Sequence, residues 1–200
     1  LAADGADASK PANRKLKSPA EQSHPLFSGN LKQDVAYFAF NLTTNEVLGY
    51  DPTYKVNPPL RPAEHVEALR EALADGTIDA VATDHAPHAR HDKEHAFAEA
   101  AFGMLGLETA LAAVVETMIN PGLLSWPELA KRMSIMPAHI ARLADQGRPL
   151  AVGEPANVIL VDPAARRVVD RNDSASLSRN NPWHGRELPD PVVATIWAGR

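Results

Sequence analysis

The sequence predicts an α/β fold followed by a smaller region of β-strands. Residues 62–75 have the spacing of an amphipathic helix, and Gly76 and the short apolar run 78–83 follow directly. After residue 147 this spacing ends, and short β-branched runs separated by turn residues take its place. A helix, a tight turn and a buried strand form one αβ unit, whereas the later runs predict a small, mainly β part.

The composition is that of an ordinary globular protein. The chain has 200 residues, of which 44% are hydrophobic and 22% charged, enough for one domain or slightly more. Its net charge of −5 argues against nucleic acid or an anionic membrane, and the lack of cysteine excludes disulfides and thiolate metal sites. No apolar run approaches the roughly 18 residues of a membrane span, and no signal peptide is visible. Nothing in the composition thus indicates a nucleic-acid-binding, membrane or secreted protein, and we expect a cytoplasmic one.

The first part of the chain has no clear pattern. Residues 1–25 are rich in Ala, Ser, Asp, Lys and Pro, so we expect them to be disordered or loosely packed. His24 stands alone in this segment and is not expected to bind a metal. Residues 35–42 are aromatic and apolar and are predicted to form a strand, which would be an exposed edge if nothing covered it.

The helices are predicted from apolar spacing. Pro62 suits the first position of the helix over 62–75, and the strand over 77–83 should be buried between this helix and a second one over 104–118. Two shorter helices are expected at 126–133 and 137–143. The helix positions that we expect to face the core are Val66, Leu69, Leu73, Leu107, Leu111, Val114, Val115, Met118, Ile140 and Leu143.

The strands of the tail are predicted from short apolar runs. Residues 157–162 read as a buried strand ended by a turn, and 167–170 and 192–198 read as two more. We expect the three to pair as one small sheet.

Ionisable side chains gather where the strand 78–83 ends. Asp84 follows directly, and His85 and His88 come next, with Pro87 stiffening the turn between the two histidines. A carboxylate and imidazoles at one strand end suit a divalent metal and proton transfer. The alternative is a polar loop that merely follows a core strand, and the residues alone leave both interpretations open.

Three further segments carry weaker signals. The Asn57 amide offers donors and an acceptor to an amide or imide ligand, although Asn at such a position often only caps a turn. His91 and His95 would share a helix face, but neighbouring cationic side chains favour a solvated loop or helix start. In residues 101–109, two glycines permit a close backbone approach to a ligand.

Together these segments resemble the C-terminal part of a bacterial dihydroorotase, a member of the amidohydrolase superfamily. The resemblance covers about residues 48–200. Allantoinases and hydantoinases share the strand-end Asp-His but usually not the Asn-Pro-Pro-Leu-Arg segment as well. The matching segments are Lys55-Val56-Asn57-Pro58-Pro59-Leu60-Arg61, residues 79–88 with Asp84-His85-Ala86-Pro87-His88, Phe102-Gly103, Gly106-Leu107-Glu108-Thr109, Gly153-Glu154-Pro155-Ala156-Asn157 and Asn180-Asn181-Pro182-Trp183-His184-Gly185.

The resemblance implies a fold, a cofactor and roles for individual residues. It implies the C-terminal portion of a (β/α)8 barrel over 48–146 and part of a small β-sandwich domain over 147–200. It also implies zinc and the interconversion of dihydroorotate and N-carbamoyl-aspartate in pyrimidine biosynthesis. Asp84 matches the aspartate that binds metal and shuttles the proton. The substrate-binding positions are matched by Asn57, His88, Phe102 and Gly103.

The chain also departs from that family. The His-x-His-x-Arg motif, which supplies two metal ligands and a substrate arginine, is absent, and residues 1–47 do not match the family's other upstream ligands. We therefore expect a truncated form that lacks most metal ligands and is inactive alone. In the family, N-terminal residues complete the small sheet, so an edge or face should lie open here unless residues 35–42 cover it. The alternatives are a non-catalytic partner of the carbamoyltransferase or another cyclic amidohydrolase such as an allantoinase. The expected assembly is a homodimer or a complex with the carbamoyltransferase.

Overall fold

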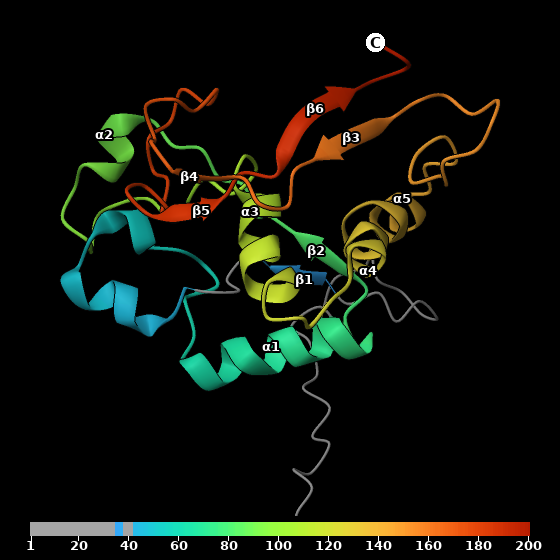
Figure 1. The fold of residues 1–200 in the computed structure, drawn as a ribbon. Helices are drawn as coiled ribbons and strands as arrows, with labels where there is room; N and C mark the ends of the chain where they lie inside the picture. Colours follow the sequence, from blue (N-terminus) through green and yellow to red (C-terminus); the bar gives the residue numbers. More distant parts are fainter. Residues whose placement is uncertain (1–34, 38–41) are drawn as a thin grey trace, which may run out of the picture.

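The structure is a computed structural model that describes residues 35–37 and 42–200 (Figure 1). The predictions for residues 1–25, for His24 and for positions 38–41 of the expected N-terminal strand lie outside the described residues. None of the helices in the described ranges is long and apolar enough to cross a lipid bilayer.

The predicted αβ unit is present, with a shorter strand than expected. Helix α1 (Ala63–Asp75) ends at Gly76, which has a left-handed φ of 89°, and β2 (Ala80–Ala82) follows. The backbone N–H of Thr77 donates to the Asp75 carboxylate at 2.8 Å, and that of Ile78 donates to the Ala72 carbonyl at 2.9 Å. These bonds close the end of the helix, so residues 77–79 belong to the turn and not to the strand.

Strand β2 pairs in parallel with β1 (Val35–Tyr37). In the register of this pair, Val35 lies opposite Ala80 and Tyr37 opposite Ala82. Residues 35–37 therefore do not cover the tail sheet, since their partner is the strand that precedes Asp84.

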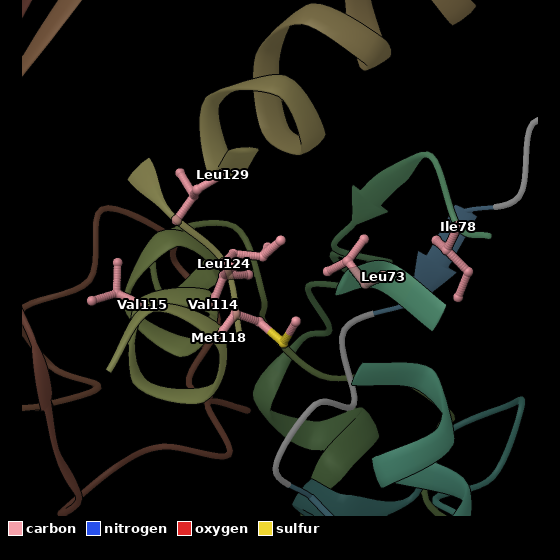
Figure 2. Packing of buried hydrophobic residues seen from close by; sticks show 7 residues of the cluster. All are labelled: Leu73, Ile78, Val114, Val115, Met118, Leu124 and Leu129. Carbon is pink, nitrogen blue, oxygen red and sulfur yellow. The ribbon is translucent and has the colours of Figure 1, made fainter. Parts of the chain in front are cut away.

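A buried apolar cluster joins α1 and the turn before β2 to the next long helix (Figure 2). This helix comprises α3 (Ala110–Val114) and a wider π-helical continuation, Val115–Ile119. Leu73 and Met118 are fully buried there, and Val81 packs against the cluster. Ile78 and Val81 thus pack with both helices, as predicted, although only residues 80–82 of the predicted strand 77–83 are extended. The buried members are Leu73, Ile78, Val114, Val115, Met118, Leu124 and Leu129.

Two helix predictions were wrong at their ends. The second long helix begins at Ala110 and not near 104, so Leu107 lies in a turn and is 61% exposed. The two helices expected at 126–133 and 137–143 form one continuous helix, and Leu143 lies beyond its end, 50% exposed. The N–H of Met136 donates to the Lys131 carbonyl, so the helix widens ahead of Pro137 instead of breaking. Its parts are α4 (Trp126–Ala130), the π-helical turn Lys131–Ile135 and α5 (Met136–Ile140).

The tail forms two separate antiparallel pairs instead of one sheet. Strand β3 (Val158–Val161) pairs with β6 (Val192–Ile196), and β4 (Arg166–Val168) pairs with β5 (Glu187–Pro189), which was not predicted. The β3–β6 pair reaches away from the helices (Figure 1). Strand β3 is not buried as expected, because Leu160 is 53% exposed. Val193 on β6 and Trp197 just beyond it are also exposed, so apolar surface does lie open here.

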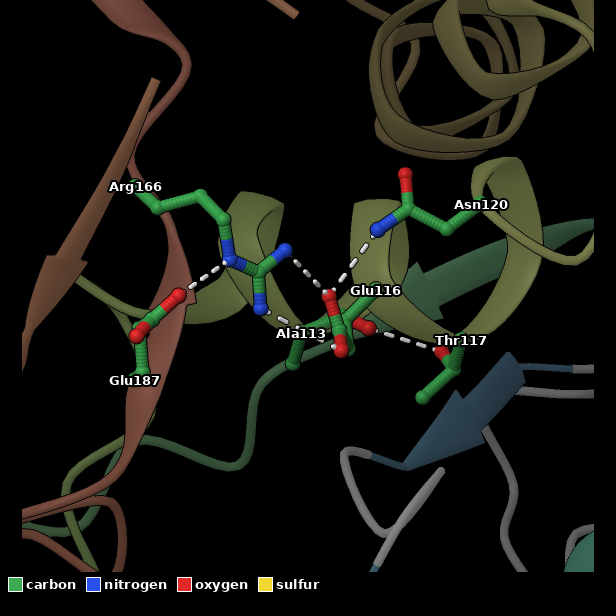
Figure 3. Close-up of polar contacts among 6 residues, drawn as sticks. All are labelled: Ala113, Glu116, Thr117, Asn120, Arg166 and Glu187. Atoms are coloured by element: carbon green, nitrogen blue, oxygen red, sulfur yellow. Dashed lines mark hydrogen bonds and ion pairs between the residues drawn. The ribbon is translucent and has the colours of Figure 1, made fainter. Parts of the chain in front are cut away.

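A second buried cluster ties the tail to the rest of the chain. Trp183 is fully buried and packs with Leu42, Leu60 and Leu188 against Ala113 of α3. Nearby, the Arg166 guanidinium bridges Glu116 of the π-helical turn and Glu187 of β5, with Nη1 to Oε2 at 3.1 Å and Nε to Oε1 at 2.7 Å (Figure 3). The helix 110–119 therefore supports both the αβ unit and the tail.

The remaining elements are short and lie before and after the αβ unit. They are the 3-10 helices Thr44–Gly49 and Pro52–Tyr54 and the helix α2 (Arg90–Lys93).

Candidate functional site

Asp84 stands where the sequence places it, just after β2. Its side chain is exposed, and its backbone φ is +45°. The left-handed region is uncommon for residues other than glycine, although Asp tolerates it better than most. Such a conformation costs free energy and is found more often where function requires a side chain to point in one direction. A free carboxylate at a strand end can take up or release a proton.

His85 fastens the loop after β2 to the segment that contains Phe102 and Gly103. It forms an isolated parallel bridge with Met104, and the next N–H, of Ala86, donates to the Met104 carbonyl at 3.0 Å. The Nδ1 atom of His85 accepts from the N–H groups of Gly106 at 3.2 Å and Leu107 at 3.1 Å. Nδ1 is therefore the acceptor nitrogen of this ring, and it is occupied by backbone donors.

His88, Phe102 and Gly103 lie together. Nε2 of His88 is 2.7 Å from the Phe102 carbonyl oxygen, and because a carbonyl only accepts, Nε2 carries the hydrogen. Gly103 has a φ of +138°, and a Cβ built on it would lie 2.6 Å from Cβ of Ala86 and 2.7 Å from Nε2 of His88. The backbone can approach His88 this closely only because residue 103 is glycine.

The backbone of Gly103 is held on both sides. Its N–H donates to the Lys55 carbonyl at 2.9 Å. Its carbonyl accepts from Nζ of Lys93 at 2.9 Å and from Nδ2 of Asn180 at 3.2 Å. Among the described residues, the N–H of Phe102 has no acceptor. Phe102 thus supplies the one open backbone donor of the pair.

Asn57 is exposed and lies two residues after Lys55, whose carbonyl contacts Gly103. The peptide bond between Asn57 and Pro58 is cis. Nζ of Lys55 donates to the Ala98 carbonyl at 2.7 Å and lies 4.5 Å from the centre of the Phe102 ring, a cation–π distance. The segment with Asn57 and the segment with Phe102 are therefore neighbours.

The structure does not gather a metal cage. Among residues 35–37 and 42–200, no group of three or more His, Asp or Glu side chains could hold a metal ion. His85 is engaged with backbone N–H groups through Nδ1, and the exposed His91 lies beside Asp92. The described residues therefore do not fit zinc by themselves, because a zinc site needs about three protein ligands.

Three residues near the candidate site had no predicted role. Lys93 is one of the cationic side chains that, in the sequence, argue against a metal site at His91 and His95, yet in the structure it is buried. Asn180 donates through Nδ2 to the Ala86 carbonyl at 3.0 Å as well as to Gly103, and Ser178 donates through Oγ to the His88 carbonyl at 2.8 Å. The Asn180-Asn181-Pro182 run was the one sequence signal that marked this segment.

Glu108 belongs to segment 106–109, one of the segments that resemble dihydroorotases. Its carboxylate binds residues 174–176 of the tail. Its carboxylate accepts from the Ser174 hydroxyl and from the N–H groups of Ala175 and Ser176, each of the latter at 3.2 Å. The hydrogen bond from Ser174, followed by those from the backbone, lowers the pKa of Glu108.

Comparison with known proteins gives a consistent result. A dihydroorotase of Streptomyces coelicolor is 57% identical over 159 residues, which make up 80% of this chain and 37% of that protein. A dihydroorotase of Mycobacterium tuberculosis is 59% identical over 151 residues, or 76% of this chain and 35% of that protein. No family model matches the chain.

Similar solved structures come from related enzymes. An L-hydantoinase (dihydropyrimidinase) from Arthrobacter aurescens superimposes with a TM-score of 0.75 at 32% identity, covering 81% of this chain and 37% of that one. A D-hydantoinase from Thermus sp. gives a TM-score of 0.73 at 22% identity over 84% of this chain and 38% of that one, which speaks for the fold alone. Over about four-fifths of its length the chain is thus similar in sequence to dihydroorotases, and it spans little more than a third of the length of the relatives it matches.

Proposed function

We propose that this chain carries part of the substrate site of a dihydroorotase, which interconverts dihydroorotate and N-carbamoyl-aspartate. The observation that carries the proposal is that residues 85–88 and 102–104 are hydrogen-bonded to each other directly after Asp84 and β2, in a chain 57% to 59% identical to dihydroorotases over about four-fifths of its length. The carboxyl end of a parallel strand that presents an ionisable side chain is a common position for catalysis.

Each residue has a role that its surroundings allow. Asp84 is the proton carrier, because its carboxylate is exposed at the strand end and its backbone holds a strained conformation. The open N–H of Phe102 donates to a substrate carbonyl or carboxylate oxygen. Nδ1 of His88 accepts a ring N–H of the cyclic amide, since Nε2 is committed to the Phe102 carbonyl. Asn57 offers its amide as a further donor and acceptor.

The proposal also covers features of the complete enzyme, namely its zinc ion, its barrel and its partners. We assign Asp84 as a zinc ligand whose companions are not among the described residues. We assign residues 48–146 to a (β/α)8 barrel and 147–200 to a small β-sandwich domain, with residues 1–47 outside both. The proposed partner is a second copy of the chain, which would give a homodimer, or a carbamoyltransferase. The proposed location is the cytoplasm.

A hydantoinase is the second candidate. It is favoured by the structural likeness to the Arthrobacter enzyme, with a TM-score of 0.75. Against it stands the higher sequence identity to dihydroorotases than to that hydantoinase, 57% against 32%. Dihydroorotate has a six-membered ring with a carboxylate, whereas hydantoin has a five-membered ring without one, so substrate discrimination at Phe102 and His88 separates the two candidates.

The proposal is tested by ligand titration of the isotope-labelled chain. Dihydroorotate and hydantoin are added separately while the backbone signals of His88, Phe102 and Gly103 are followed by NMR. We expect dihydroorotate to shift these signals with millimolar or tighter affinity, and hydantoin to leave them in place. Shifts with hydantoin alone would favour the second candidate. If neither ligand moves these signals, the segment is not a substrate site.

A further inference from the structure

Lys93 is a buried cation at the centre of the candidate site. Its Nζ donates to the carbonyls of Ala101 and Gly103, both at 2.9 Å, and lies 3.5 Å from the carbonyl of Lys55. Its side chain comes from the short helix α2, between residues 88 and 101. A buried ammonium is costly unless its hydrogen bonds are satisfied, and here backbone carbonyls satisfy them.

These carbonyls belong to two segments that carry proposed substrate positions. Ala101 and Gly103 flank Phe102, whose N–H is the open donor. Lys55 precedes Asn57, and its carbonyl also accepts the Gly103 N–H at 2.9 Å. One cation therefore holds the Asn57 segment against the Phe102 segment.

The orientation of Gly103 depends on these bonds. Gly103 has a φ of +138° and no side chain that could anchor it, so its peptide planes are oriented by its hydrogen bonds, beside the close contact with Ala86 and His88. The carbonyl is fixed by Lys93 and by Asn180, and the N–H by Lys55. A change at Lys93 is thus transmitted directly to the backbone beside His88.

The Lys93 ammonium should lose its proton in mildly basic solution. Burial, as the largest cause, lowers its pKa to about 8, with Lys55 lowering it further and Asp51 opposing. On its own helix, Arg90 pairs with Glu94 and His91 lies beside Asp92, while His88 faces the loop from the other side. A neutral amine has fewer hydrogens to donate and forms weaker bonds than an ammonium.

We propose that Lys93 is a positioning residue of the cyclic-amide site, whose ammonium aligns residues 55–57 with residues 101–103 and releases that alignment when it loses its proton. The proposal rests on the proposed function for its meaning, because the aligned groups are those assigned to the substrate. The alignment itself can be measured without substrate, metal or turnover.

The experiment follows backbone carbonyl carbons by carbon-detected NMR in the full chain between pH 6.5 and 9.5. The carbonyls of Ala101 and Gly103 should titrate together with a midpoint near pH 8, while that of the distant Gly122 stays constant. In Lys93→Met the titration should disappear, and at pH 7 the Gly103 N–H should exchange about tenfold faster, as expected for a lost charge-assisted bond. Lys131→Met, which removes an exposed lysine, should match the wild type.

The outcomes are distinct. Carbonyls that do not titrate in the wild type overturn the proposal, and this measurement needs no variant to fold. A titration that survives in Lys93→Met assigns the proton to another group and also overturns it. A final arm adds dihydroorotate at pH 7, where Lys93→Met should bind about tenfold more weakly than Lys131→Met. If the carbonyls titrate as expected but dihydroorotate does not bind the wild type, the proposed function fails and the alignment by Lys93 stands.

Discussion

Nε2 of His88 lies 2.7 Å from the carbonyl oxygen of Phe102, and this bond joins two segments that are 14 residues apart. It fixes the tautomer of the imidazole and the plane of the peptide that precedes Gly103. The arrangement of the candidate site and its local stability therefore depend on it.

Replacing His88 should weaken the fold modestly. His88→Ala removes the donor to the Phe102 carbonyl, and we expect the free energy of unfolding to fall by about 1 kcal/mol, the usual net value of one hydrogen bond. Urea denaturation measures the change. His91→Ala is the matched control, since His91 is exposed, and should stay within about 0.5 kcal/mol. Equal losses in both variants would show that the His88 bond contributes nothing specific.

Gly103 should tolerate no side chain. Gly103→Ala places a Cβ 2.6 Å from Ala86 and forces an L residue into a φ of +138°, so we expect a loss of about 2–4 kcal/mol from strain and overpacking together. Gly122 also has a positive φ, +78°, but nothing lies within 4 Å of its Cβ position. Gly122→Ala should thus cost only about 1 kcal/mol. Equal destabilisation of the two variants would contradict the close packing at Gly103.

The sequence predicted the αβ unit around α1 and β2 well, because local rules decide it. The apolar face of α1, the left-handed Gly76 and the polar residues after the strand are all readable without tertiary information. The predictions that Leu107 and Leu143 face the core from within helices were wrong for the opposite reason. Helical spacing alone does not reveal that a helix starts at Ala110 or stops at Ile140, since hydrogen bonds and turns set those ends.

The roles of Lys93 and Asn180 could not be predicted from local sequence. A lysine in a charged run is most often solvated, and only the folding of 101–103 around its Nζ shows otherwise. Asn180 reaches residues 86 and 103 from far along the chain. Such long-range polar contacts have no periodic signal, whereas Asp84 and His88 could be named because they follow a strand directly.

Stability should depend on pH through Lys93. Because its pKa is about 8 in the folded chain and near 10.5 when unfolded, the unfolded chain binds more protons between these values. The contribution of Lys93 to the free energy of unfolding therefore rises as the pH increases from 8 toward 10.5. Measured by urea denaturation, the free energy of unfolding of the wild type should therefore increase relative to that of Lys93→Met as the pH rises over this range. A stability difference that is flat with pH would show that the lysine keeps an ordinary pKa.

The β3–β6 pair should be the least protected part of the tail. Two strands alone are marginally stable in water, and Leu160, Val193 and Trp197 are largely exposed. We expect its amides to exchange far faster than those of Val114 and Met118, which lie in the buried cluster. Uniformly strong protection across residues 157–198 would argue against an open pair.

The same surface should promote self-association. The double variant Val193→Lys, Trp197→Lys adds charge to a flat apolar edge, so we expect less association in analytical ultracentrifugation with an unchanged monomer fold. Leu177→Lys is the control, because Leu177 is even more exposed than Val193 and Trp197 but lies outside this pair. An equal effect of the control would assign the association to general surface charge.

The most direct test is an assay of the purified chain with added zinc, in both directions, with bound zinc counted. The described residues hold no three-ligand cluster, so we expect less than one zinc per chain and no turnover above that of Asp84→Asn. Asparagine tolerates the left-handed conformation of residue 84 and removes only the carboxylate. Stoichiometric zinc, together with turnover that disappears in Asp84→Asn, would contradict the account of an incomplete dihydroorotase site.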